Sequence, residues 1–462
     1  MSRSSVSLAS TAAAALVWAA VVGPLAAQEP APPDTGAGAA GVAEVAPGGP
    51  VRLSVHEAVE RALAANEDAR IARAQVDRTQ GIVREAFGRA LPTIDGGYRM
   101  TRNLQRPVIF FNQNGEVNQI TIGDEHEHAF TLSVEQPLFD RGLGAALSAA
   151  RHGNAASEAA YERTLTDVAL DTREAYYRVL RARAQVAVRE GALRLVEARL
   201  RQVRLFFDVG TASEFEVLSV EVAAENERPL LIRARNELDL AVNSLNRAIG
   251  LPIDVEIVLE DSLAYQPEAV SLEEAVGRAL TSRDDLRAQR ESVELADELV
   301  RVERAENFPT LTLNLDVARR ASSPDLIPDE RQFSQSASAA LALDIPVFDG
   351  RRTQGRLLQA RADAVAANER LRGLERDILV DVQNYWQSVR AAAEAVEATR
   401  ATVARAHRAY EIGLVRFRNG LSTQLELDEV EQDVVTAESN AAEALYFHML
   451  ARAFLRHAMG ER

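Results

Sequence analysis

The sequence predicts a mainly α-helical protein with a β-barrel part, built from two copies of one structural unit. Two hairpins carry an alternation of apolar and polar residues that is typical of strands with one apolar face. Long segments without proline follow these hairpins, and the same motifs recur twice in the same order. Strands of about 10 residues with this alternation span an outer membrane as the wall of a water-filled barrel.

The N-terminus has the features of a secretory signal peptide over residues 1–27. Arg3 supplies positive charge, an apolar run follows, and small residues precede a cleavage point at Gln28. We therefore expect the mature protein outside the cytoplasm. Residues 28–50 are rich in proline, glycine and alanine, which predicts a flexible linker.

Composition argues against several classes of function. The chain has 462 residues, a formal net charge of −16 and no cysteine. The negative charge argues against nucleic acid as a partner. Without cysteine, thiol catalysis, thiolate metal sites, disulfides and a cysteine-linked lipid anchor are excluded. The sequence contains no catalytic serine motif or phosphate-binding loop, so we predict no enzyme and no cofactor.

The chain is one unit written twice. The segment from Ser54 to Leu63 is echoed by the segment from Ser271 to Leu280, at a distance of 217 positions. Pro309 follows Pro92 at the same distance, and later matched residues lie 209 or 210 positions apart. Each unit is expected to run helix, strand, strand, long helix, turn and returning helix.

The duplication predicts the domain boundaries. A first repeat covers residues 51–250 and a second covers residues 271–462. The linker at 251–270 contains two prolines and is expected to lie outside the helical part. Ser54 with Glu57, and the matched pair in the second repeat, resemble capping boxes that begin a helix.

Four strands are available in each chain. Residues 91–100 and 130–135 form the first predicted pair, and residues 308–317 and 334–349 form the second. Four is fewer than the eight or so of the smallest ordinary barrel. Open sheet edges cannot lie in lipid, so a barrel requires two or more copies of the chain.

A long helix follows each strand pair. Residues 143–207 contain no proline, and a continuous helix of about 65 residues would extend about 100 Å. Apolar residues within it step by three and four, the spacing of coiled packing. These are Leu193, Val196, Leu200, Val203 and Phe207. Pro229 is expected to kink or break the first returning helix, while Ser439 occupies the matched position in the second.

Two further groups of residues invite a functional interpretation. His126 and His128 could bind a metal, but no third ligand lies nearby in the sequence, so a polar loop at the barrel rim is favoured. Residues 102–125 are predicted as its long extracellular loop. Aromatic residues well inside the long helices are expected to pack rather than to form a membrane girdle. They are Tyr176, Tyr177, Tyr385 and Trp386.

With these motifs in place, the chain resembles the TolC-type outer-membrane efflux protein (OEP) family from roughly Leu53 to Gly460. The resemblance rests on the doubled Ser-x-x-Glu-Ala helix starts, the Leu-Pro-Thr and Phe-Pro-Thr strand entries, the Pro-x-Phe-Asp exits and the two glycine turns. It implies a homotrimer whose twelve strands, four per chain, close one outer-membrane β-barrel. A long periplasmic α-helical barrel would continue from it.

The resemblance also implies a function and a location. The protein would be a passive exit duct of a tripartite efflux pump or a type I secretion system, in the outer membrane of a Gram-negative bacterium. Its partners would be outer-membrane lipid, a periplasmic adaptor (membrane-fusion) protein and an inner-membrane pump. The helical turns would form the periplasmic tip that meets the adaptor, at Val209, Gly210, Ser213, Asn419, Gly420 and Thr423.

Acidic residues just after the turns narrow the channel in this family, and the matching positions are Glu216, Glu426 and Glu429. Three-fold symmetry would gather such carboxylates around one axis, where they favour cations and can bind divalent ions. A solvated helix face is the ordinary alternative. Ser422 stands where some members carry an arginine that locks the closed tip.

A periplasmic coiled-coil adaptor or scaffold is the alternative function, because it would also be secreted, acidic and rich in helices. Such an adaptor usually has one helical hairpin flanked by small β domains. Here the sequence predicts two hairpins and four strands suited to lipid, which favours the channel.

Overall fold

The computed structural model describes residues 51–113 and 116–462. The predicted signal peptide and linker lie outside these residues. The first half of the chain contains β1 (Val51–Leu53), α2 (Val55–Ala65), α3 (Glu67–Gly88), β2 (Thr93–Arg102), β3 (Val108–Gln113), β4 (Glu116–Thr121), β5 (His126–Phe139), α4 (Arg141–Asp208) and α5 (Glu214–Ala248). The second half contains β6 (Ile257–Leu259), α6 (Leu272–Ser282), α7 (Asp284–Ala305), β7 (Thr310–Ser323), the 3-10 turn η1 (Glu330–Gln332), β8 (Phe333–Asp344), α8 (Arg352–Arg418) and α9 (Gln424–Ala458).

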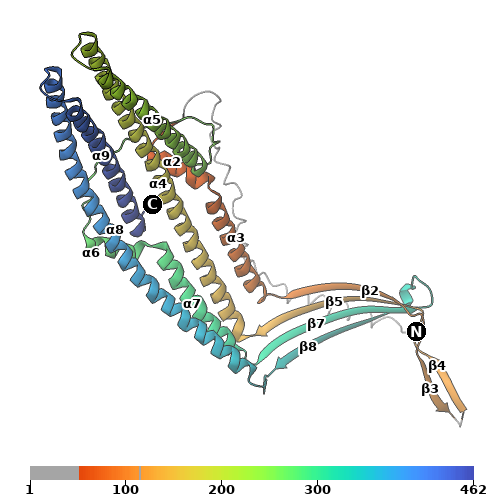
Figure 1. Ribbon diagram of the computed structural model, residues 1–462. Coiled ribbons are helices and arrows are strands. Elements are labelled where there is room, and N and C mark those ends of the chain that lie inside the picture. The colour runs from red at the N-terminus through yellow and green to blue at the C-terminus, as the bar shows by residue number, and fades with distance from the viewer. Residues whose placement is uncertain (1–50, 114–115) are drawn as a thin grey trace. The chain divides into compact units, whose positions relative to one another are not determined.

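The four predicted strands are confirmed and form one antiparallel sheet in the order β2-β5-β7-β8 (Figure 1). Strand β5 of the first repeat pairs with β7 of the second, so the two repeats share this sheet. Leu132 lies opposite Val317, and Leu313 lies opposite Leu341. Because paired residues point to the same side, the predicted apolar residues of the four strands gather on one face.

The long helices are confirmed as continuous. Helix α4 runs for 68 residues and α8 for 67, and each packs against a returning helix of 35 residues, α5 or α9 (Figure 1). The predicted break at Pro229 is wrong, because α5 continues through this residue. Pro229 is exposed, so water can bond the carbonyl that its missing N–H leaves free. None of the described helices is long and apolar enough to cross a membrane.

The helix that opens each repeat differs from the prediction, since it is two helices rather than one. In the first repeat, α2 ends and α3 begins at Asn66, whose backbone is extended. The side chain of Asn66 accepts hydrogen bonds from the N–H groups of Asp68 (2.7 Å) and Ala69 (3.3 Å). These bonds cap α3 and stabilise the interruption. Arg283 takes the same position between α6 and α7.

The prediction of a loop before β5 is wrong in two respects. It contains the hairpin of β3 and β4, and the histidines after it belong to β5 rather than to a loop. His126 pairs with Arg102 and His128 with Met100, so β2 and β5 are longer than the alternation predicted. Both histidine side chains are buried, and Nδ1 of His128 lies 2.8 Å from the hydroxyl of Tyr98.

The linker between the repeats joins the core of the first repeat. Strand β6 pairs in parallel with β1, and Leu251 and Leu259 are buried there. Tyr176 is completely buried, and its hydroxyl lies within hydrogen-bond distance of two acceptors, the carbonyl of Leu53 (2.9 Å) and the carboxylate of Asp261 (2.7 Å). Trp386 likewise donates to the carbonyl of Val270 at 3.0 Å. The aromatic residues of the long helices therefore pack, as predicted.

Candidate functional site

The turns between α4 and α5 and between α8 and α9 share one backbone geometry. Gly210 and Gly420 have φ values of 77° and 68°, in the left-handed region that favours glycine. In the first turn the N–H of Thr211 donates to the carbonyl of Phe206 at 2.8 Å, and the second turn repeats this bond. This is the Schellman arrangement, which satisfies the last carbonyls of a helix and reverses the chain within a few residues.

Each returning helix begins with a capping box. The N–H of Ser213 donates to the carboxylate of Glu216 at 2.6 Å, and the N–H of Glu216 donates to the Ser213 hydroxyl at 3.3 Å. Thr423 and Glu426 make the same two bonds, each 3.2 Å long. The hydrogen bonds from Ser213 lower the pKa of Glu216. Two of the three predicted acidic residues are therefore also structural caps.

The third predicted acidic residue, Glu429, lies nearly one helical turn after Glu426 and is exposed. Within one chain, no hydrogen bond or ion pair of the described residues joins Glu216, Glu426 and Glu429. The structure thus places all three near the turns, where the resemblance expects them. A ring of these residues would require several copies of the chain.

An apolar cluster holds the two helical hairpins together beneath the turns. It combines Val196 and Val203 of α4, Val220 of α5, and Phe417 and Leu427 of α8 and α9. The rings of Phe206 and Phe417 are 5.8 Å apart at 56°, a tilted packing that aromatic pairs favour. This end of the chain is therefore one packed body that both repeats build.

A buried charged network, which the sequence analysis missed, lies beside this cluster. Arg199 of α4 reaches α9, where its guanidinium is 2.6 Å from Asp428 and 3.5 Å from Glu431. The side chains of Arg199 and Glu431 are only 2% and 4% exposed. At 3.5 Å the Arg199–Glu431 pair lacks hydrogen-bond geometry, and Nε of Arg199 and Oε2 of Glu431 have no other hydrogen-bond partner in the described part of the chain.

Burial raises the pKa of Glu431 to about 7, with the charge of Arg199 opposing this shift and that of Asp428 adding to it. The group can therefore gain or lose a proton near neutral pH, unlike an exposed glutamate. No local motif could have predicted this network, because Arg199 and Glu431 belong to different repeats and are joined only by the packing of α4 against α9.

Most of the chain matches one known protein family. The family model described as "Outer membrane efflux protein" matches residues 58–251 and 275–461, which is most of the chain. The chain belongs to the outer membrane efflux protein family. The match covers both repeats, and it favours the exit duct over the periplasmic adaptor.

Relatives of this efflux protein cover most of its length. It is 23% identical to the outer membrane protein TolC of Vibrio cholerae, over 84% of this chain and 86% of the relative. It is 24% identical to the alkaline protease secretion protein AprF of Pseudomonas aeruginosa, over 73% of this chain and 70% of the relative. The family description and the name of the TolC relative both refer to the outer membrane, and the outer membrane is accordingly the location of this chain.

Solved structures show the same fold. The outer membrane protein VceC of Vibrio cholerae aligns with a TM-score of 0.76 and 21% identity, over 88% of this chain and 96% of that structure. The outer-membrane channel OprN aligns with a TM-score of 0.75 over 88% of this chain and 90% of that structure. The predicted fold class, helical barrel with a β part and an internal duplication, is therefore confirmed.

The tip of this efflux protein exposes large apolar side chains around the caps. Val209, the C-cap of α4, is 72% exposed, and Phe215 on the next helix is 78% exposed. Leu421 and Leu425 of the second turn are also exposed. Exposed large apolar residues at both turns are typical of surfaces that another protein covers.

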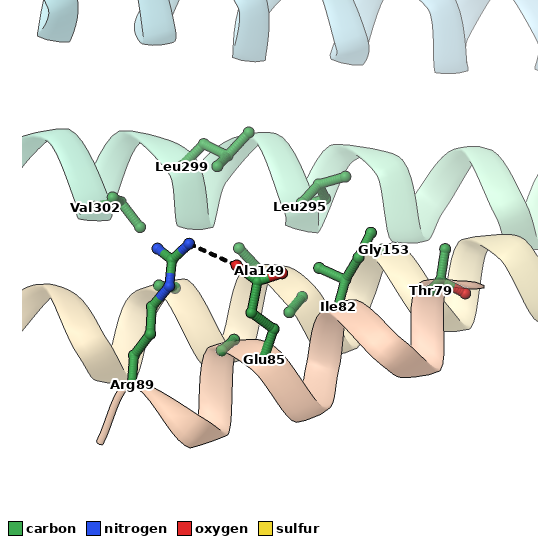
Figure 2. A pocket seen from close by; sticks show the side chains of 12 residues that line it. Thr79, Ile82, Glu85, Arg89, Ala149, Gly153, Leu295, Leu299 and Val302 are labelled. Carbon is green, nitrogen blue, oxygen red and sulfur yellow. Dashed lines mark hydrogen bonds and ion pairs between the residues drawn. The ribbon is translucent and has the colours of Figure 1, made fainter. Parts of the chain in front are cut away.

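A cavity of about 530 Å³ lies away from the tip, between α3, α4 and α7 (Figure 2). Its lining includes Leu295, Leu299 and Val302 of α7 and Ala149 and Gly153 of α4. Its polar groups include the ion pair of Arg89 with Glu85, at 2.8 Å. The other polar residue of the lining labelled in Figure 2 is Thr79, whose hydroxyl donates to the carbonyl of Val76 at 2.9 Å. Across residues 51–113 and 116–462, no three histidine, aspartate or glutamate side chains are grouped to hold a metal.

Proposed function

We propose that this efflux protein is a homotrimeric channel whose twelve strands close one β-barrel and whose helices form a gated periplasmic duct. A periplasmic adaptor and an inner-membrane pump would deliver its cargo. Transport would be passive in this chain, because it supplies a path and a gate while the energy comes from the pump.

The open sheet carries this proposal. Strands β2 and β8 are the edges of the four-stranded sheet, and each has a neighbour on one side only among the described strands. The apolar face is exposed, with Ile94 67% and Leu341 66% accessible. Unpaired backbone groups cannot lie in lipid, so both edges need partners. Since β2 and β8 run antiparallel to each other, β8 of one copy can pair with β2 of the next and continue the same pattern.

The mass of the detergent-extracted protein tests this closure. We expect light scattering or native mass spectrometry of the full chain to give three copies per particle. A monomer or a dimer would contradict the trimeric barrel, because the particle would then contain four or eight of these strands instead of twelve.

A test of the gate requires variants that remove the carboxylate charge and keep the capping box at the start of α9. Glutamine preserves a capping box, so the double variant Glu426→Gln with Glu429→Gln should leave the turn intact. We expect this variant to weaken the block of single-channel conductance by divalent cations, because two of the three carboxylates that each chain gives to the proposed ring would be gone.

Glu57→Gln is the matched control for that experiment. Glu57 makes the same capping box with Ser54 at the start of α2, so its substitution removes one capping charge from a different helix. Unchanged cation block in the double variant would exclude Glu426 and Glu429 from the gate. Loss of block in the control variant would show that the effect is not specific to the tip.

The exposed turns would form the contact with the adaptor. Leu421→Asp places a charge on the exposed apolar surface of the second turn, where Leu425 is also exposed. We expect export by living cells to fall while single-channel conductance and trimer mass stay unchanged. Normal export in that variant would exclude this surface as the docking site.

A further inference from the structure

A polar cavity of about 230 Å³ lies between the two repeats, far along the chain from the turns. A site for one water molecule needs roughly 10–15 Å³, so this cavity has room for a small polyatomic ion. Its lining includes His56 of α2, Arg173 and Tyr177 of α4, Asp261 of the linker, and Arg452 and Arg456 of α9. Arginines of both repeats therefore meet here, in a chain whose net charge is −16.

The carboxylates near the cavity are already engaged. Glu268 accepts from Arg452 at 3.2 Å and lies 3.6 Å from Arg456, so one carboxylate serves two guanidiniums. Asp261 accepts from the N–H of Val55 at 2.8 Å and from the Tyr176 hydroxyl at 2.7 Å. Neither acid is free to neutralise a third guanidinium.

Arg173 is that third guanidinium. It is half-buried on the cavity wall, and no carboxylate of the described residues lies within ion-pair distance of it. Burial lowers its pKa, the Tyr177 phenol opposes this effect, and the nearby charge of Arg456 adds to it. A partly desolvated cation next to another cation is unfavourable unless an anion is bound beside it.

We propose that this cavity binds a small oxyanion, with Arg173 and Tyr177 of the first repeat and Arg456 of the second as its donors. A guanidinium presents a planar fork of N–H donors that matches two oxygens of a phosphate or a carboxylate. The bound anion would join α4 to α9 and so connect the two repeats. The proposal goes beyond the channel function and does not depend on it, because every donor belongs to one chain.

Titration calorimetry of the full-length protein in detergent tests the proposal, with sodium phosphate and sodium acetate as probes and sodium chloride at matched ionic strength. We expect one binding site per chain for at least one of the two oxyanions and none for chloride. The comparison between phosphate and acetate distinguishes a phosphate ligand from a carboxylate ligand. Binding of neither oxyanion would overturn the proposal.

Arg173→Gln and Arg178→Gln form a matched pair on α4. Arg178 bonds to Glu174 at 2.7 Å and lies outside this cavity. We expect Arg173→Gln to weaken oxyanion binding roughly tenfold or more, since it removes a charge-assisted donor, and Arg178→Gln to leave it unchanged. Equal binding by wild type and Arg173→Gln would overturn the proposal.

Thermal unfolding supplies a second measurement on the same proteins. In chloride, Arg173→Gln should fold and be at least as stable as wild type, because it loses an unpartnered cation. The oxyanion should raise the unfolding temperature of wild type and not that of Arg173→Gln. A destabilised variant in chloride would show that Arg173 has a partner within the protein, and this too would overturn the proposal.

Discussion

Glu431 shows how the fold sets the chemistry of a single residue. Its carboxyl group is buried between α4 and α9, and the neighbouring Arg199 already has a closer partner in Asp428. Burial therefore outweighs the attraction of Arg199, and the pKa rises from 4.5 to about 7. Between these two values the folded protein binds a proton more tightly than the unfolded chain does. The contribution to stability is complete below about pH 4.5 and is lost as the pH rises through about 7.

Glu431→Gln should remove this pH dependence. Each pKa unit corresponds to about 1.4 kcal/mol, so at pH 8 we expect the variant to be more stable than wild type by on the order of 3 kcal/mol. The difference should vanish near pH 4, where the wild-type carboxyl is protonated in both states. Thermal unfolding in detergent at several pH values between 4 and 8.5 measures it.

Glu429→Gln is the control for this prediction, because Glu429 is exposed on the same helix. Its unfolding profile should follow that of wild type. Parallel pH profiles for wild type and Glu431→Gln would show that the buried carboxyl is not what changes charge in this range.

At the scale of the helix, the turn glycines and the interior glycines should respond in opposite ways. Gly420 has a φ of 68°, whereas Gly373 lies inside α8 with open space where a Cβ would stand. We expect Gly420→Ala to destabilise the tip by about 1 kcal/mol, and Gly373→Ala to stabilise the helix by roughly 0.5–1 kcal/mol. Unfolding temperatures of the two variants check this, and a stabilising Gly420→Ala would contradict the Schellman turn.

The two returning helices offer a second matched pair. Pro229 is exposed inside α5, whereas Ser439 at the equivalent position of α9 donates to Gln185 at 3.1 Å. Pro229→Ala restores a backbone donor, and we expect a gain in stability of up to about 3 kcal/mol. Ser439→Pro removes a donor and a contact, and should cost about 3 kcal/mol or more. Hydrogen exchange of the helix amides gives the local effect of each change.

The sequence predicts those elements whose signals are local. Alternation predicts the four strands, and the glycine followed by serine or threonine predicts the turns and caps, because each depends on neighbours within a few residues. The interruption at Asn66 escapes this approach, since asparagine is unremarkable inside a helix until its side chain bonds the next turn. Local sequence patterns could not predict two pairs of residues, because the members of each pair come from different repeats and meet only through tertiary packing. These pairs are Arg199 with Glu431 and Arg173 with Arg456.

For the whole molecule, the decisive property of the sheet is that its two faces need different solvents. Ala339 pairs with Leu315 on the apolar face, while its neighbour Ala340 pairs with Asn314 on the polar face. The two alanines are both exposed in the single chain. In a closed barrel the first would face lipid and the second would face the water-filled lumen, so one substitution at the two positions separates the two environments.

Arginine at these two alanines therefore gives the last prediction. Ala339→Arg places a charge in hydrocarbon near the middle of the strand, and we expect it to destabilise the folded barrel by about 2–4 kcal/mol. Ala340→Arg points to water, where Asp316 lies on the same face, and should fold and reach the outer membrane at the wild-type level. The amount of folded protein in isolated outer membranes measures both effects. Equal loss of folded protein in the two variants would mean that both faces are packed against protein. Equal tolerance of the two substitutions would mean that neither face meets lipid. Either result would contradict the placement of this sheet in the membrane.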